Sequence, residues 1–225
     1  MAVILNRTLQ AANGANFVNF GFTPTSGSLL LAYCAALDSA VFGTFTGAYS
    51  WTLLSAVSNP TIGFRQAIYG RVSTGNEPWF QFSITGSTSN IAALIELDPN
   101  KLDTYVSRGQ GSSVGTVAAI SFFNTGTAYG GVGFASQFAG STWSAGSTSG
   151  WGSTINIDSQ LTNGTAQSLA VVDYDPGAAL ASGVNTVLIN SNTSAQYFTM
   201  GTVYDGPPPG PSGGQEILTL RSQGY

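Results

Sequence analysis

Residues 28–37 have the sequence Ser28-Leu-Leu-Leu-Ala-Tyr-Cys-Ala-Ala-Leu37, a run that is apolar on both of its alternating faces. Successive side chains of a β-strand point to opposite faces of the sheet, so a half-buried strand alternates apolar and polar residues. A run without that alternation is typical of a strand covered on both sides. We therefore predict a central strand at residues 28–37, inside a layered β-protein.

Strand patterns extend outward from this run in both directions. In Trp79-Phe-Gln-Phe-Ser-Ile84 the aromatic Phe80 and Phe82 share one face with Ile84, as a half-buried antiparallel strand requires. No segment keeps an apolar stripe at the 3.6-residue period of a helix without an interrupting glycine. The expected strands are residues 3–9, 16–23, 28–37, 51–57, 64–73, 79–85, 90–98, 116–123, 130–138, 151–158, 167–175, 184–190, 195–204 and 215–221.

The strand pattern occurs twice along the chain. The matching segments begin about 100 residues apart, and the offset grows only inside Gly/Ser/Asn-rich gaps, where surface loops tolerate insertions. The pairs are Phe17–Phe22 with Val117–Phe122 (offset 100), Ser50-Trp51 with Gly150-Trp151 (100), Ala67–Tyr69 with Ala170–Val172 (103), Phe80–Ile84 with Asn185–Ile189 (105), and Ile91–Asp98 with Phe198–Asp205 (107).

This repeat predicts an all-β protein made of two tandem antiparallel jelly-roll-like β-sandwiches. The first copy is expected at residues 1–98, and the connector with the second copy at 99–205. Residues 206–225 form a Pro/Gly-rich tail with a terminal strand. The alternative is one large two-sheet sandwich built from both halves.

The composition excludes several functions. Charged residues make up 7% of the chain, against about 25% in ordinary globular proteins. Six Lys and Arg against ten Asp and Glu give a net charge of −4, which cannot build a phosphate-binding stripe, so no nucleic-acid partner is expected. The absence of histidine excludes histidine-based triads and metal sites. A polar, weakly charged surface suits contacts with neighbouring proteins or neutral glycans.

Targeting signals and redox chemistry are also not expected. The start of the chain lacks the basic and apolar regions of a signal peptide. No apolar run approaches the roughly 20 residues of a membrane span, so no membrane insertion is expected. The single cysteine, Cys34, is interpreted as a small buried hydrophobe, and it leaves no intrachain disulfide.

The carboxylates offer little chemistry. Glu96 and Asp98 alternate with apolar residues, which puts them about 6–7 Å apart on one strand face, within the range of glycoside hydrolases. Any i, i+2 pair in a strand has that spacing, so we interpret them, like Asp173 and Asp175, as solvated strand ends. Calcium binding by the Asp98–Asp103 segment lacks the ligand count of a dedicated loop. We predict no catalytic residue, no metal and no cofactor.

Aromatic residues and the tail supply the candidate contact surface. Trp51 and Trp151 hold equivalent places in the repeat, and each is expected to anchor a strand to its core. Trp143 lies among small polar residues in a predicted loop, where it is either an exposed contact or buried under the loop. The proline-rich tail is unmatched by the repeat and is a candidate assembly element. The candidate contact residues are Trp143, Trp79, Pro207, Pro208, Pro209, Leu218 and Leu220.

Five segments of the first copy follow one another in a characteristic order: Gly27–Ala32, Ser50–Leu53, Arg65–Val72, Trp79–Ile84 and Ala92–Leu97. The second copy has a fainter version of the same order, in Gly150-Trp151, Ser168–Val172 and Ile217–Arg221. This order resembles the duplicated jelly-roll proteins encoded in structural gene clusters of tailed bacteriophages.

The resemblance implies a virion protein without catalytic residues. It implies a capsid decoration (cement) protein or fibre component that is homo-oligomeric and binds other capsid or tail proteins. The alternative is a tail-associated module that binds a host receptor or surface glycan through loop aromatics. A hydrolase that uses Glu96 is the third hypothesis.

Overall fold

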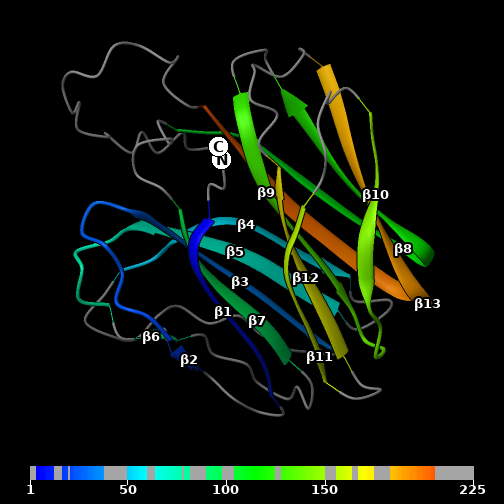
Figure 1. Ribbon diagram of the computed structural model, residues 1–225, viewed down its shortest axis with the longest axis horizontal. Helices are drawn as coiled ribbons and strands as arrows, with labels where there is room; N and C mark the ends of the chain where they lie inside the picture. Colours follow the sequence, from blue (N-terminus) through cyan, green and yellow to red (C-terminus); the bar gives the residue numbers. More distant parts are fainter. Residues whose placement is uncertain are drawn as a thin grey trace.

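In the computed structural model, the described part of the chain consists of β-strands, turns and short connections. The expectation of an all-β protein is confirmed, and two antiparallel sheets pack as a β-sandwich (Figure 1). The described residues are 4–12, 17–19, 21–37, 50–59, 64–77, 79–81, 90–97, 104–124, 128–149, 156–163, 167–174 and 183–205.

The N-terminal half forms a five-stranded antiparallel sheet in the order β1-β7-β3-β5-β4, and a second, two-stranded sheet pairs β2 with β6. These strands are β1 Ile4–Ala12, β2 Phe17–Asn19, β3 Leu29–Leu37, β4 Thr52–Asn59, β5 Phe64–Val72, β6 Trp79–Gln81 and β7 Asn90–Leu97.

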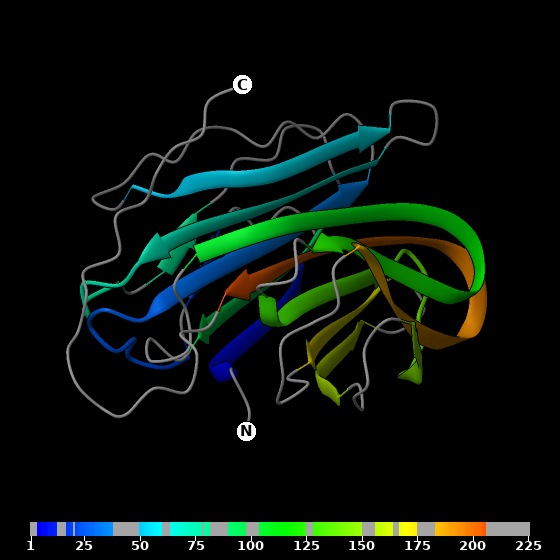
Figure 2. The ribbon, with the colours of Figure 1, turned by 90° about the horizontal axis from the view of Figure 1, so that it is seen from above.

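The C-terminal half forms a six-stranded sheet in which β13 lies between β10 and β9 and also pairs with β8 along its length. The long antiparallel pair of β8 and β13 arches at one end of the molecule in Figure 2. These strands are β8 Thr104–Asn124, β9 Ala128–Gln137, β10 Trp143–Ser149, β11 Asn156–Asn163, β12 Gln167–Tyr174 and β13 Gly183–Asp205.

The central strand predicted from residues 28–37 is confirmed as β3. It lies in the middle of its sheet, between β7 and β5, and residues 30–36 are fully buried. Leu31 and Tyr33 enter a core between the two large sheets, whereas Ala32 and Cys34 enter a separate core on the opposite face. An apolar residue is therefore needed at every position, which explains the missing alternation.

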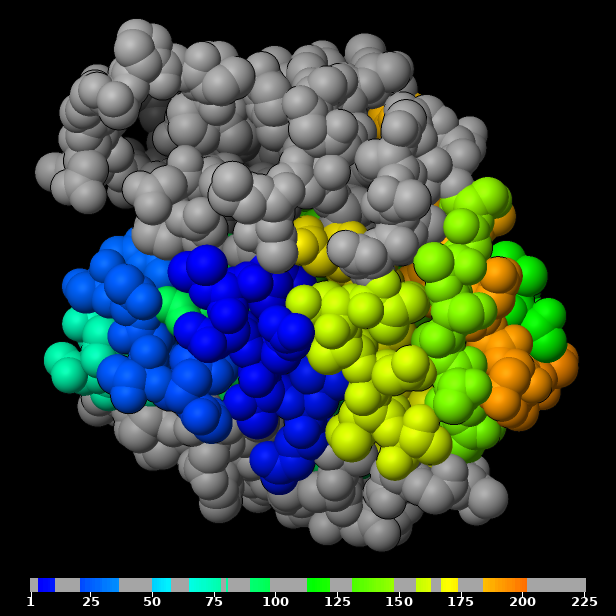
Figure 3. All heavy atoms as spheres, in the orientation of Figure 1, coloured from blue at the N-terminus to red at the C-terminus, as the bar shows by residue number. Residues whose placement is uncertain are grey.

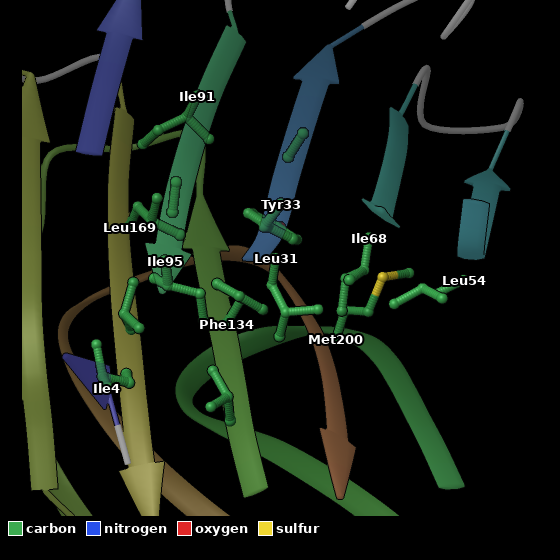
Figure 4. Close-up of a cluster of buried hydrophobic side chains, with 14 of the residues drawn as sticks. Ile4, Leu31, Tyr33, Leu54, Ile68, Ile91, Ile95, Phe134, Leu169 and Met200 are labelled. Atoms are coloured by element: carbon green, nitrogen blue, oxygen red, sulfur yellow. The ribbon is translucent and has the colours of Figure 1, made fainter. Parts of the chain in front are cut away.

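Three stacked cores run through the molecule. The first lies in the N-terminal half, where Phe80 of β6 covers the outer face of the large sheet. The second lies in the C-terminal half, where Ala118 and Ile120 of β8 share a buried cluster with Trp143 of β10. The third lies between the large sheets of the two halves (Figure 4), and its labelled side chains come from both: Ile4, Leu31, Tyr33, Leu54, Ile68, Ile91, Ile95, Phe134, Leu169 and Met200.

The strand order of the two halves is equivalent. The order β1-β7-β3-β5-β4 corresponds to β8-β13-β9-β12-β11, with the second half of β13 in the place of β7. The register agrees residue by residue: Tyr33 pairs with Ile68, and Phe134 pairs with Val171, 103 residues after Ile68. Both edge pairs carry a register shift at the same place, between Leu53 and Ser55 in β4 and between Ile157 and Ser159 in β11.

The outer strands follow a different register from the one that the sequence offsets require. Offsets of 100 and 105 would carry the observed Phe17–Gln81 pair onto Val117 and Thr186. In the structure Val117 pairs with Asn190 instead. Local sequence similarity locates these strands but does not fix their register, because register is a property of the two paired strands and their buried faces and not of either strand alone.

Several strand boundaries also differ from expectation. For example, β8 begins at Thr104 and not at residue 116, and β11 spans Asn156–Asn163 and not 151–158. Residues 184–190 and 195–204 were expected as two strands, but β13 is continuous and is interrupted only by a register shift between Asn190 and Ala195. Residues 143–149, expected as a loop, form β10. A Cβ atom at Gly146 would lie 2.5 Å from the Leu188 carbonyl oxygen, so this glycine lets β10 approach β13 closely.

Candidate functional site

Glu96 of β7 is buried and holds two segments of the N-terminal half together. Its carboxylate accepts hydrogen bonds from Asn6 Nδ2 and from the Thr25 backbone N–H, both at 2.6 Å. Burial raises the pKa of Glu96, but the hydrogen bonds from Asn6 and Thr25 outweigh burial and lower it overall. The expectation of a solvated strand end is wrong here, because β1 and the 21–28 loop cover this end of β7. Asp173 is also buried, so the same expectation is wrong for it. Asp98 and Asp175 lie outside the described residues.

A second buried carboxylate, Glu77, closes the turn that follows β5. It accepts hydrogen bonds from Ser73 Oγ at 2.8 Å and the Thr74 N–H at 2.7 Å, and it pairs with Arg71 at 3.1 Å. Gly75 has a φ of +85°, the left-handed conformation that the turn requires. Although burial raises the pKa of Glu77, these hydrogen bonds lower it overall, so the carboxylate is ionised in its structural role.

The third carboxylate, Asp158, joins the two halves at one edge of the sandwich. Arg7 Nε of β1 lies 2.8 Å from Asp158 Oδ2 of β11, and the side chains are 39% and 10% exposed, respectively. Figure 3 shows these two strands side by side. Burial raises the pKa of Asp158, and the lowering effects of Arg7 and Ser159 do not cancel it.

A polar seam, defined by Tyr33, Gln66, Ser136 and Thr199, crosses the core between the halves. The Tyr33 hydroxyl lies 2.8 Å from Ser136 Oγ and donates to Gln66 Oε1 at 3.2 Å. Gln66 Nε2 donates to the Thr199 carbonyl at 3.0 Å. Burial raises the pKa of Tyr33, so its hydroxyl remains protonated. These bonds fix the register of one half against the other, because a slip would leave buried polar groups unpaired.

A second polar network surrounds Gln137 at the bend of β13. The Gln137 amide accepts hydrogen bonds from Ser141 Oγ at 2.7 Å and Ser191 Oγ at 2.8 Å. Its nitrogen donates to the carbonyls of Thr193 at 3.0 Å and Ala195 at 3.2 Å. These contacts satisfy the backbone that the register shift leaves outside the regular ladder. The network holds the bend in place and contains no titratable group.

Cys34 is buried, as expected, and its thiol donates a weak hydrogen bond to the Ala67 carbonyl at 3.9 Å. Burial raises the pKa of Cys34, which keeps the thiol protonated and unreactive. In the part of the chain that the structure describes, no three His, Cys, Asp or Glu residues are close enough to hold a metal ion.

The predicted aromatic contacts have different outcomes. Trp143 is only 4% exposed and packs in the core of the C-terminal half, so the hypothesis of an exposed contact at this residue is wrong. Its neighbours are small because β10 lies close to β13, not because the segment is a surface loop. Trp51 is half-buried against Phe80, with ring centroids 4.9 Å apart, as expected for a core anchor.

Other predicted contact residues lie where the structure gives no side-chain contacts. Trp79 belongs to β6 and pairs with Asn19, and its side chain is not among those described. Trp151 and the tail residues Pro207, Pro208, Pro209, Leu218 and Leu220 lie outside the described residues. These predictions therefore stay predictions.

Exposed apolar residues on β8 and β13 were not singled out by the sequence. Val114 is 66%, Val117 45% and Val184 69% exposed. The alternation of Val117-Ala-Ala-Ile-Ser121 is the signal that could have found them, since it puts Ala118 and Ile120 in the core and Val117 on the opposite face. They are the large apolar residues that are exposed in the described part of the β8–β13 pair.

No protein-family model, curated protein or solved structure matches this chain. Among the described residues, no helix has the length and apolar character to cross a membrane.

Proposed function

We propose that this protein is a non-enzymatic structural component of a tailed-bacteriophage particle, either a capsid decoration protein or a fibre component. The observation that carries the proposal is the core between the two halves, which joins two equivalent β-arrays into one body. A virion component must persist outside the cell, and a continuous core reinforced by the polar seam favours such persistence.

The surroundings of the polar and charged groups also favour a structural role. Glu96, Glu77 and Asp158 each bind partners that connect segments of the fold. The low charge of the chain leaves its surface dominated by Ser, Thr, Asn, Gln and Gly, which suits close contact with neighbouring subunits. Such contacts would place the protein against other virion proteins and against copies of itself.

The alternative of a receptor- or glycan-binding tail module is less well supported. That hypothesis depended on loop aromatics, and the aromatic ring most central to it, Trp143, is buried. Sugar recognition by stacking requires an accessible ring face. We therefore favour the structural role.

Particle composition tests the proposal. Particles of the phage whose genome encodes this chain are purified on a density gradient and quantified by mass spectrometry, with the major capsid protein as the internal standard. We expect the chain at a fixed ratio that survives repeated purification. A chain found only in the soluble lysate, and absent from purified particles, contradicts a virion role.

A further inference from the structure

The strand β8 forms one edge of its sheet over a length of 21 residues. Among the described residues β8 pairs only with β13, so its second edge has no partner strand there. One carbonyl of this strand, that of Ala119, accepts a hydrogen bond from Thr199 Oγ1 at 2.7 Å. Figure 3 shows the green spheres of β8 at the rim of the molecule, beside the orange spheres of β13. An edge of this kind presents backbone N–H and C=O groups that can pair with another strand.

The segment Val117–Asn124 of β8 differs from the other described edges. The edge strands β1, β4, β10 and β11 each have a register shift, and a β-bulge interrupts further pairing. Val117–Asn124 pairs with Gly183–Asn190 without any shift. It also has no charged residue and no proline, the other devices that protect an edge from pairing.

The sequence of this segment is complementary to itself. When two copies run antiparallel about a twofold axis at Ile120, Val117 lies opposite Phe123 of the second copy, and Ala118 lies opposite its Phe122. Each phenylalanine position therefore faces a smaller residue, and no charges meet. The register also keeps the buried positions Ala118 and Ile120 on the core side of an extended sheet.

We propose that residues 117–123 pair with the same segment of a second copy of this chain, forming a continuous antiparallel sheet across a twofold axis at Ile120. The second copy is the partner that the segment fits, because no like charges meet and each phenylalanine position faces a smaller residue. Pairing also brings a second copy beside the exposed side chain of Val117. The proposal rests on the proposed function for its biological purpose, and on β8 alone for its geometry.

The first test measures the mass of the full-length protein by light scattering after size exclusion, over a range of concentrations. We expect a dimer. In Ala119→Lys the two new ammonium groups lie near the twofold axis and repel each other, so the dimer should weaken at least tenfold. The matched control is Ala56→Lys on the other large sheet's edge strand β4, where Ala56 is exposed, and this variant should remain dimeric.

The second test does not depend on how well Ala119→Lys folds. In the proposed register Ala119 lies opposite Ser121 of the second copy, at a Cα separation of about 4.5–5.5 Å, which a disulfide can span. Ala119→Cys/Ser121→Cys should therefore form covalent dimers on mild oxidation. The control pair Ala56→Cys/Ser58→Cys should not, and the buried Cys34 stays silent in both.

A protein that is monomeric at all concentrations overturns this proposal. So does a dimer that tolerates Ala119→Lys and gives no crosslink through residues 119 and 121. These outcomes are separate from the test of the virion role. A crosslinked dimer that is absent from particles supports the pairing and contradicts the function, whereas a monomer bound to particles does the reverse.

Discussion

The rings of Tyr33 and Phe134 stack with their centroids 4.6 Å apart and their planes 4° from parallel, and they occupy equivalent positions in the two halves. Equivalent residues meet in this way when the halves face each other across an approximate twofold axis. The surroundings of the two rings are not symmetric. Ser136 and Gln66, which bind the Tyr33 hydroxyl, correspond in the register to the apolar Ala35 and Leu169.

The first prediction concerns the Tyr33 hydroxyl. Tyr33→Phe keeps the ring stack but removes the hydroxyl from Ser136 and Gln66 in a dry core, so we expect a loss of about 1–3 kcal/mol in the free energy of unfolding. Chemical denaturation measures the loss. Ser136→Ala should cost less stability in the Tyr33→Phe background than in the unmodified protein, because the hydroxyl that Ser136 binds is already absent there. If the loss in the double variant equals the sum of the two single losses, Tyr33 and Ser136 do not stabilise each other.

The second prediction concerns the asymmetric edge pair. Asp158 occupies the register position of Leu54, which is buried in the core between the halves. Asp158→Leu removes a carboxylate that is largely desolvated and adds apolar contact, so stability at neutral pH should stay equal or rise by about 1 kcal/mol. Asp158→Asn is the control and should not gain the apolar contribution. A loss above about 2 kcal/mol in Asp158→Leu would show that the pair with Arg7 is a net stabiliser.

The third prediction concerns stability at acid pH. The pKa of Glu96 is lowered below its ordinary value of 4.5, so its contribution is present above that pH and is lost as the pH falls through the lowered pKa. Glu96→Gln should lose about 1–3 kcal/mol at pH 7 and show a shallower decline in stability below pH 4.5.

Asp158 is a control, because its pKa is shifted in the opposite direction to that of Glu96. Its pKa is raised, so its contribution is present at low pH and is lost as the pH rises through the raised pKa. Asp158→Asn should therefore steepen the fall in stability toward acid, whereas Glu96→Gln flattens it. Thermal unfolding followed by circular dichroism from pH 3 to pH 7 separates the two. Parallel pH profiles for Glu96→Gln and the unmodified protein would contradict the prediction for Glu96.

The fourth prediction concerns the bend of β13. Gln137→Leu removes the acceptor of Ser141 and Ser191 and the donor to two backbone carbonyls, so we expect a loss of about 2–4 kcal/mol. Hydrogen exchange should accelerate around residues 191–195. Gln196→Leu, at a half-buried glutamine on β13, is the control and should change stability by less than about 1 kcal/mol. Equal effects of the two substitutions would show that Gln137 has no special role.

The local pattern of residues determined the elements of this protein. Apolar positions on both faces of Leu29–Leu37 require a doubly covered strand, and the period of two elsewhere requires half-buried strands. The repeated order of those strands follows from the same local signals. Each of these features depends on residues that are close together in the sequence, which is why the sequence alone suffices to predict them.

The fate of individual side chains was decided by distant strands. Trp143 is buried because β10 joins β13, and Glu96 is buried because β1 and the 21–28 loop cover it. Neither contact has a local signal, so a loop and a solvated strand end were the expectations. The face-to-face packing of the two halves is likewise tertiary. The sequence by itself determined where most of the strands lie, but only the folded chain decided which strand covers which, because burial depends on contacts between segments about 100 residues apart.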